Sequence, residues 1–126
     1  MRAMVIDDSR AMRKMLRDFL EKLGILVVAE AGNGKEALTV FQDSLPLDLA
    51  LVDWNMPEMN GYEFLKQVRE NPAHRRVRMM MVTTEGEAAN ILAALDAGAD
   101  EYLIKPFCRE AFREKLALMG IVDAAS

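Results

Sequence analysis

The sequence predicts an α/β protein with a doubly wound parallel sheet. Five short apolar runs, rich in Val, Ile, Leu and Met, alternate with five stretches whose apolar side chains recur at helical spacing. Strands that alternate with helices in this way form a parallel sheet with helices on both faces. The 126 residues fit one domain, and no repeat or low-complexity segment interrupts the pattern.

Strands are expected where apolar runs end in turn residues. The predicted strands cover residues 2–6, 25–30, 47–52, 77–84 and 100–105. The third ends before Pro57, which lacks the amide that a strand ladder needs. The run Met79-Met80-Met81 is interpreted as core packing, because strands buried on both faces read as continuous apolar runs.

Helices are expected between these strands. The predicted helices cover residues 9–23, 35–42, 60–71, 85–97 and 109–119. They end at turn residues, among them Gly24, Asn71-Pro72 and Gly98. In the fourth helix, Ala89, Leu92 and Leu95 recur at helical spacing and are expected to face the core.

Composition and charge exclude several classes of protein. The net charge is −4 with no long basic run, which disfavours nucleic-acid binding, and the cluster Arg75-Arg76-Val77-Arg78 is interpreted as a solvated loop rim. The single cysteine, Cys108, excludes an intrachain disulfide and a thiolate metal cluster. No signal peptide precedes the first strand and no apolar stretch is long enough to span a bilayer. We therefore expect a cytoplasmic protein without membrane insertion, formed by one domain over residues 1–122 and a short tail over 123–126.

Acidic side chains follow two of the predicted strands. Asp7 and Asp8 come directly after the first strand, and Asp53 follows the third. The carboxyl ends of parallel strands meet at one edge of an α/β sheet, where ligands bind. Carboxylates this close need a cation or a proton, and a set of oxygen ligands favours Mg²⁺. An alternative stays open, because Asp8 or Ser9 could simply cap the next helix.

The last two strands add a hydroxyl and an amine. The fourth ends in Thr83-Thr84 and the fifth in Lys105. Together with the acids, this set fits a phosphoryl group held on a carboxylate beside Mg²⁺, with the hydroxyl as donor and the ammonium as a point charge. The lone His74 has no partner ligand at a suitable spacing and is interpreted as neither a metal ligand nor a phosphodonor.

Six motifs carry a resemblance to a known family. They are Val5-Ile6-Asp7-Asp8-Ser9, Asp53-Trp54-Asn55-Met56-Pro57, Asn60-Gly61, Met81-Val82-Thr83, Ala97-Gly98-Ala99 and Tyr102-Leu103-Ile104-Lys105-Pro106-Phe107. In order and spacing, over almost the whole chain, these motifs resemble receiver domains of two-component response regulators, and most of all the single-domain chemotaxis members. The resemblance implies a flavodoxin-like fold of five βα units with strand order 2-1-3-4-5.

The resemblance also implies an acceptor and its metal. Asp53 would be the phosphoacceptor, modified by a phosphohistidine on a sensor histidine kinase. Asp8, Asp53 and the backbone carbonyl of Asn55 would ligate Mg²⁺ directly, and Asp7 would reach the metal through water.

A second set of implied roles concerns the phosphoryl group and the switch. Thr83 would donate its hydroxyl to the phosphoryl group and Lys105 would pair with the same oxygens. The Lys105-Pro106 bond is often cis in receivers. Tyr102 matches the switch aromatic, expected to turn inward once Thr83 is drawn to the phosphate.

The output face is implied in the same way. It would run from the helix of Ala88 across Tyr102 to the last helix, and in chemotaxis members it binds the flagellar motor switch. Ile91, Tyr102 and Lys115 keep the chemotaxis pattern, whereas Ala88 and Leu118 stand where lysines are expected. The face is therefore less basic than the pattern, and the downstream partner could be the motor switch or another effector. We expect a monomer that could dimerise on activation.

Three rival functions remain at this stage. A stand-alone phosphorelay shuttle would carry the same pocket and pass the phosphoryl group to a histidine phosphotransfer domain. An aspartyl-phosphate hydrolase would need a second acid two residues after the nucleophile, where this chain has Asn55. A phosphorylation-independent pseudo-receiver ranks last, because every acid of the pocket is present. Self-modification followed by hydrolysis is not counted here as enzyme activity.

Overall fold

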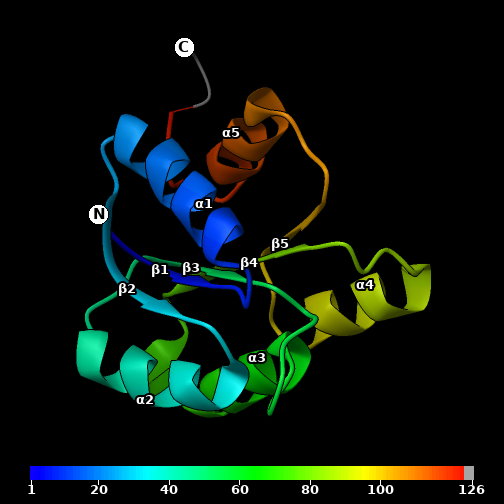
Figure 1. Cartoon of the computed structure of the whole chain (residues 1–126). Helices are drawn as coiled ribbons and strands as arrows, with labels where there is room; N and C mark the ends of the chain where they lie inside the picture. The colour runs from blue at the N-terminus through cyan, green and yellow to red at the C-terminus, as the bar shows by residue number, and fades with distance from the viewer. Residues whose placement is uncertain (124–126) are drawn as a thin grey trace.

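Five parallel strands form a single sheet in the computed structural model, which describes residues 1–123 (Figure 1). The strands are β1 (Arg2–Ile6), β2 (Leu26–Ala31), β3 (Leu49–Val52), β4 (Arg78–Thr83) and β5 (Glu101–Ile104). Their order across the sheet is β2-β1-β3-β4-β5, and every neighbouring pair is parallel. The predicted flavodoxin-like topology is confirmed. Of the predicted tail, residues 124–126 lie outside the described residues.

Helices cover both faces of the sheet. They are α1 (Arg10–Lys22), α2 (Gly34–Ser44), α3 (Gly61–Glu70), α4 (Ala88–Asp96) and α5 (Arg109–Leu118), with a short 3₁₀ helix η1 (Pro72–His74). The helices α1 and α5 lie on one face, and α2, α3 and α4 lie on the other (Figure 1). Within residues 1–123, no helix is long and apolar enough to cross a lipid bilayer.

The strands divide their side chains between two apolar cores. Successive side chains of a strand point to opposite faces, so the central strands contribute alternately to the layers on either side. In β4, Met79 and Met81 pack towards α2 and α3, while Met80 packs towards α1 and α5. All three are fully buried, which confirms the interpretation of the methionine run as core packing.

The predicted core face of α4 is wrong. Leu92 and Leu95 are 61% and 39% exposed, whereas Ala94 is fully buried and Ile91 packs against the same core. The helix also begins at Ala88, three residues after the predicted start. Because α4 is rich in Ala and Leu all around, the apolar spacing fits more than one face and does not select the buried one.

The segment after α3 is only partly a solvated rim. Arg75, Arg76 and Arg78 are exposed, as the sequence indicates, but Val77 is buried. His74, the last residue of η1, is buried with its ring edge-on to Phe41, the centroids 5.0 Å apart. This segment therefore contributes to the core beneath α2 and α3.

Arg69, on α3, makes hydrogen bonds to the segment after α3 and to the residues just before β5. Its Nε donates to the carbonyl of Gly98 at 2.9 Å, and its two terminal nitrogens donate to the carbonyls of His74 at 2.8 Å and Val77 at 2.7 Å. One of them also pairs with the Asp100 carboxylate at 3.0 Å. Burial lowers the pKa of Arg69, and the nearby Asp100 carboxylate opposes that shift.

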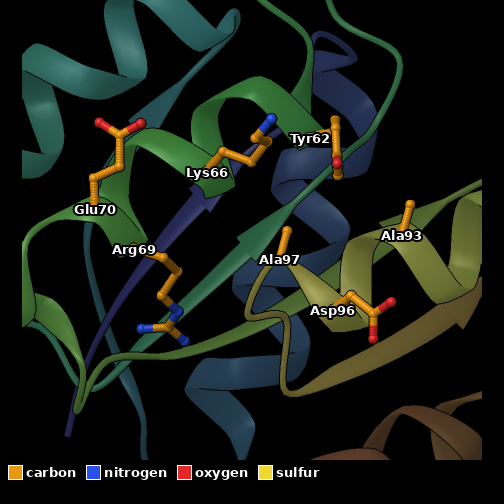
Figure 2. A pocket seen from close by; sticks show the side chains of 7 residues that line it. All are labelled: Tyr62, Lys66, Arg69, Glu70, Ala93, Asp96 and Ala97. Atoms are coloured by element: carbon orange, nitrogen blue, oxygen red, sulfur yellow. The ribbon is translucent and has the colours of Figure 1, made fainter.

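Arg69 lies under a hollow of about 520 Å³ between α3 and α4 (Figure 2). Gly98, two residues after the end of α4, has a φ of +116°. A Cβ at Gly98 would lie 2.7 Å from the Arg69 side chain. The left-handed conformation and the close contact both require glycine at this position.

We predict that Arg69→Ala lowers the free energy of unfolding by about 3 kcal/mol, because three carbonyls and a carboxylate lose their donor. Urea unfolding followed by circular dichroism measures the change. Arg75→Ala is the control, because the Arg75 side chain is exposed and has no hydrogen bond or ion pair among residues 1–123. Equal losses in the two variants would contradict the structural role of Arg69.

Candidate functional site

Asp7 lies at the carboxyl end of β1, and both its backbone amide and its carboxylate are hydrogen-bonded. Its backbone amide donates to the carbonyl of Ala31, at the end of β2, at 3.0 Å. One carboxylate oxygen accepts from the amide of Ser9 at 2.8 Å, and the other accepts from Lys105 Nζ at 2.7 Å. The residue is 1% exposed, so this carboxylate is a buried charge with fixed partners.

Of the two residues that could cap the helix after β1, Ser9 does so and Asp8 does not. The Ser9 hydroxyl accepts from the amide of Met12 at 3.2 Å and caps α1. Asp8 is exposed, and within residues 1–123 its carboxylate has no hydrogen-bond or ion-pair partner. Oxygens from Asp7, Asp8 and Asp53 nevertheless lie within 4.8 Å of one another. The predicted meeting of three acids at one sheet edge is confirmed.

Asp53 follows β3, next to β1 in the sheet. Its amide donates to the carbonyl of Ile6 at 2.9 Å, which continues the pairing of the two strands to the site. One carboxylate oxygen accepts from the amide of Asn55 at 3.2 Å, and the other lies 3.4 Å from Lys105 Nζ. A Cβ at Gly61 would lie 2.1 Å from the Asp53 carbonyl oxygen, so glycine lets α3 start directly against the site.

Lys105 supplies the compensating charge. It follows β5, and its backbone amide donates to the carbonyl of Thr83 at 2.8 Å. Its ammonium pairs with both Asp7 and Asp53 and is mostly buried. The Lys105-Pro106 bond is cis, as the resemblance implies. Three carboxylates against one ammonium leave the pocket with a negative charge, which favours a cation at its open side near Asp8.

Thr83 and Tyr102 are joined through Glu85. The buried Thr83 hydroxyl accepts from the amide of Glu85 at 3.2 Å, and the Tyr102 hydroxyl donates to the carbonyl of Glu85 at 2.7 Å. The Glu85 carboxylate in turn accepts from the side chain of Asn90 at 2.9 Å. Tyr102 is 7% exposed, so it already points inward in this structure. Burial, followed by the charges of Glu85 and Asp53, raises the pKa of Tyr102 to about 12.

Two features of the site were missed by sequence reasoning. Glu85 links the hydroxyl of Thr83 to Tyr102, and the only signal for it is its position two residues after Thr83. The ring of Trp54 stacks on Tyr62, with centroids 5.0 Å apart and 16° between the planes. That pair is eight positions apart, across a loop and a helix start, and no periodicity indicates it.

The family of the chain follows from this fold and this constellation. The response regulator receiver domain family matches residues 3–117. The chain belongs to this family.

Within the family, the chain is similar to chemotaxis proteins. It is 38% identical over 119 residues to chemotaxis protein CheY1 of Helicobacter pylori, covering 94% of this chain and 96% of that protein. It is 40% identical over 116 residues to the chemotaxis protein CheY homolog of Campylobacter jejuni, covering 92% and 89%. The chain is thus a CheY-like receiver.

Solved structures agree with this placement. Chemotaxis protein CheY4 of Vibrio cholerae matches with a TM-score of 0.82 at 33% identity, covering 91% of this chain and 94% of that one. The CheX-CheY-BeF3-Mg complex of Borrelia burgdorferi matches with a TM-score of 0.87 over 92% of this chain and 86% of that one, at 24% identity. The second likeness concerns the fold alone.

We predict a stability loss at alkaline pH that depends on Tyr102. A pKa raised from 10 to about 12 in the folded protein means that the neutral phenol stabilises the fold below pH 10. That contribution, roughly 2 kcal/mol, is lost as the pH rises towards 12. Urea unfolding of the parent and of Tyr102→Phe at about pH 8 and about pH 12 isolates it. A difference between the two proteins that stays constant with pH would refute the shift.

Proposed function

We propose that Asp53 accepts a phosphoryl group from a phosphohistidine on a sensor histidine kinase. The observation that carries this proposal is the gathering of Asp7, Asp8 and Asp53 within 4.8 Å, with Lys105 on two of them. An acceptor needs an ionised carboxylate at an exposed edge and positive charge for the incoming oxygens. Asp53 is the acid that the central strand β3 delivers to that edge.

The oxygen donors around Asp53 fit Mg²⁺. Within residues 1–123, the Asp8 carboxylate on the open side of the cluster has no hydrogen-bond or ion-pair partner, and the side-chain ligands of the cluster are carboxylate oxygens. Asp8, Asp53 and the backbone carbonyl of Asn55 would hold the ion, with Asp7 reaching it through water. When bound, the ion neutralises charge on the phosphoryl oxygens.

The transfer itself is a displacement at phosphorus. A carboxylate oxygen of Asp53 forms the new P–O bond as the P–N bond to the histidine breaks. The electron pair of the P–N bond returns to the imidazole, which carries a proton on its other nitrogen and leaves neutral. Lys105 moves its ammonium from the carboxylates to the phosphoryl oxygens, and the Thr83 hydroxyl turns from acceptor to donor. Water later hydrolyses the acyl phosphate and restores the Asp53 carboxylate.

We predict that acetyl phosphate with Mg²⁺ adds one base-labile phosphoryl group to the parent protein. Asp53→Asn should not be labelled, because an amide oxygen cannot form the acyl phosphate. Intact-mass spectrometry measures the label. Asp43→Asn, an exposed carboxylate on α2, is the matched control and should be labelled like the parent. Undiminished labelling of Asp53→Asn would place the acceptor elsewhere.

The proposed output surface is the face formed by α4, β5 and α5. Ile104 and Leu118 are 38% and 71% exposed there, and the Tyr102 hydroxyl donates to the carbonyl of Glu85, three residues before α4. Lys115 is paired with Glu101 at 2.9 Å, so this cation is already partly neutralised within the chain. Contacts with apolar side chains would therefore carry more of a partner's affinity than charge.

The proposed partners are a sensor histidine kinase upstream and the flagellar motor switch downstream, which the resemblance to chemotaxis receivers implies; the relatives are named as chemotaxis proteins. A second effector or a second copy of the chain remains open as the occupant of the output face. These partners place the protein in the cytoplasm. Phosphorylation acts by fixing Thr83 and Glu85, and so fixes Tyr102 in its inward position.

We predict that beryllofluoride with Mg²⁺ strengthens binding of the output face to a motor-switch peptide or to a second copy. Fluorescence anisotropy with the labelled peptide and light scattering measure the two outcomes. Tyr102→Ala should weaken whichever interaction appears, whereas Glu70→Ala, at an exposed position at the end of α3, should not. Activation that changes neither peptide affinity nor association would move the output to another face.

A further inference from the structure

Arg13 connects α1 to the turn that carries the acid pair. Its Nη1 donates to the backbone carbonyl of Asp7 at 2.5 Å, and its Nε donates to the Glu30 carboxylate at 3.2 Å. Glu30 lies on β2, so one guanidinium joins a helix, a neighbouring strand and the turn after β1. The Arg13 side chain is 18% exposed, and such a partly buried, charge-assisted bond is among the stronger hydrogen bonds.

The carbonyl of Asp7 belongs to the peptide unit that leads into Asp8. The peptide unit before Asp7 is already fixed, because the Asp7 amide donates to the carbonyl of Ala31. The peptide after Asp7 is held through its carbonyl by Arg13. Since no hydrogen bond or ion pair within residues 1–123 holds the Asp8 carboxylate, the orientation of this peptide determines where that carboxylate points.

We propose that Arg13 is a positioning residue for the metal site. It orients the Asp7-Asp8 peptide so that the Asp8 carboxylate faces Asp53 before an ion arrives. The inference rests on the proposed function, because it concerns the same Mg²⁺ site. A guanidinium close to a cation site would repel the ion. The Glu30 carboxylate offsets the charge of Arg13, so Arg13 holds the turn without strongly repelling the cation.

If Arg13 acted on the metal site through its charge alone, its removal would change Mg²⁺ affinity in the direction opposite to the one that a positioning role predicts. Removing a cation near an acidic pocket should tighten Mg²⁺ binding, whereas releasing the turn should weaken it. Arg17 separates the two effects within this chain. It pairs with the same Glu30 from the same helix, and no hydrogen bond joins it to Asp7. Arg17→Ala therefore makes the same change in charge while leaving the turn in place.

The test is a Mg²⁺ titration followed by the fluorescence of Trp54, the residue after Asp53, in the parent, Arg13→Ala, Arg13→Lys and Arg17→Ala. We expect Arg13→Ala to weaken Mg²⁺ binding about tenfold, the lower end of what partners of metal ligands contribute. Arg17→Ala should bind as the parent does or more tightly. Arg13→Lys, which keeps a donor of similar length, should recover most of the affinity. Asp8→Ala shows how the Trp54 fluorescence responds to Mg²⁺ when the metal site is lost.

A second readout does not depend on the metal. Amide hydrogen exchange, measured by NMR without Mg²⁺, should be faster in Arg13→Ala at Ser9, whose amide donates to the Asp7 carboxylate, and unchanged in Arg17→Ala. Circular dichroism checks that Arg13→Ala is folded. If it is not, Arg13→Met, which keeps an unbranched apolar side chain, replaces it in both measurements.

Three results would overturn the inference. One is Mg²⁺ binding by the Arg13 variant as tight as in the parent, and another is an equal loss in Arg17→Ala. The third is unchanged exchange at Ser9 in Arg13→Ala. A parent that does not respond to Mg²⁺ would instead refute the proposed metal site, and the exchange measurement would still judge whether Arg13 holds the turn.

Discussion

The contact on which the structure depends is the pairing of Lys105 with Asp7 and Asp53. Three carboxylates within 4.8 Å repel one another, and two of them are almost completely buried. The ammonium reaches them at 2.7 and 3.4 Å from a residue 98 positions later than Asp7 in the chain. Burying such charges is tolerable only when each has a partner in good geometry. The fold therefore has to bring the end of β5 over the ends of the central strands, and the strand order observed here does so.

The surroundings of this contact are fixed by main-chain geometry. Gly61 lets α3 begin against the Asp53 carbonyl, and the backbone of Asp7 is held by Ala31 and Arg13. Asp8 is the exception, since nothing among the described residues holds its carboxylate. On the other side, Glu85 connects the Thr83 hydroxyl to the Tyr102 phenol. We propose that one side of the pocket holds a cation and that the other transmits the effect of phosphorylation.

Much of the fold could be predicted from the sequence because strands buried on both faces leave a simple signature. The methionine run in β4, the apolar run before Asp53 and the glycine after α1 each indicate one structure. The face of α4 could not be predicted, because Leu92 and Leu95 fit the helical period as well as Ala94 does. Exposed leucines also break the expectation that apolar residues lie inside, and burial here is decided by how α4 lies against the sheet edge.

Some features of the site could likewise be predicted from the sequence, and others could not. Acids, a hydroxyl and a lysine at strand ends could be identified, because parallel strands end at a common edge. The contacts that hold them could not. The bond from Arg13 to a backbone carbonyl and the link through Glu85 both depend on loop paths that leave no periodic pattern. Assigning the cap to Ser9, and leaving Asp8 free, likewise required the geometry of the turn.

We propose that this acidic edge is a metal site completed by Asp53. A crystal of the parent protein soaked in Mn²⁺, an anomalous scatterer that takes the place of Mg²⁺, tests it most directly. We expect one strong anomalous peak in contact with the carboxylates of Asp8 and Asp53 and with the carbonyl of Asn55. A peak at another position, or none at a concentration that saturates the Trp54 signal, would contradict it.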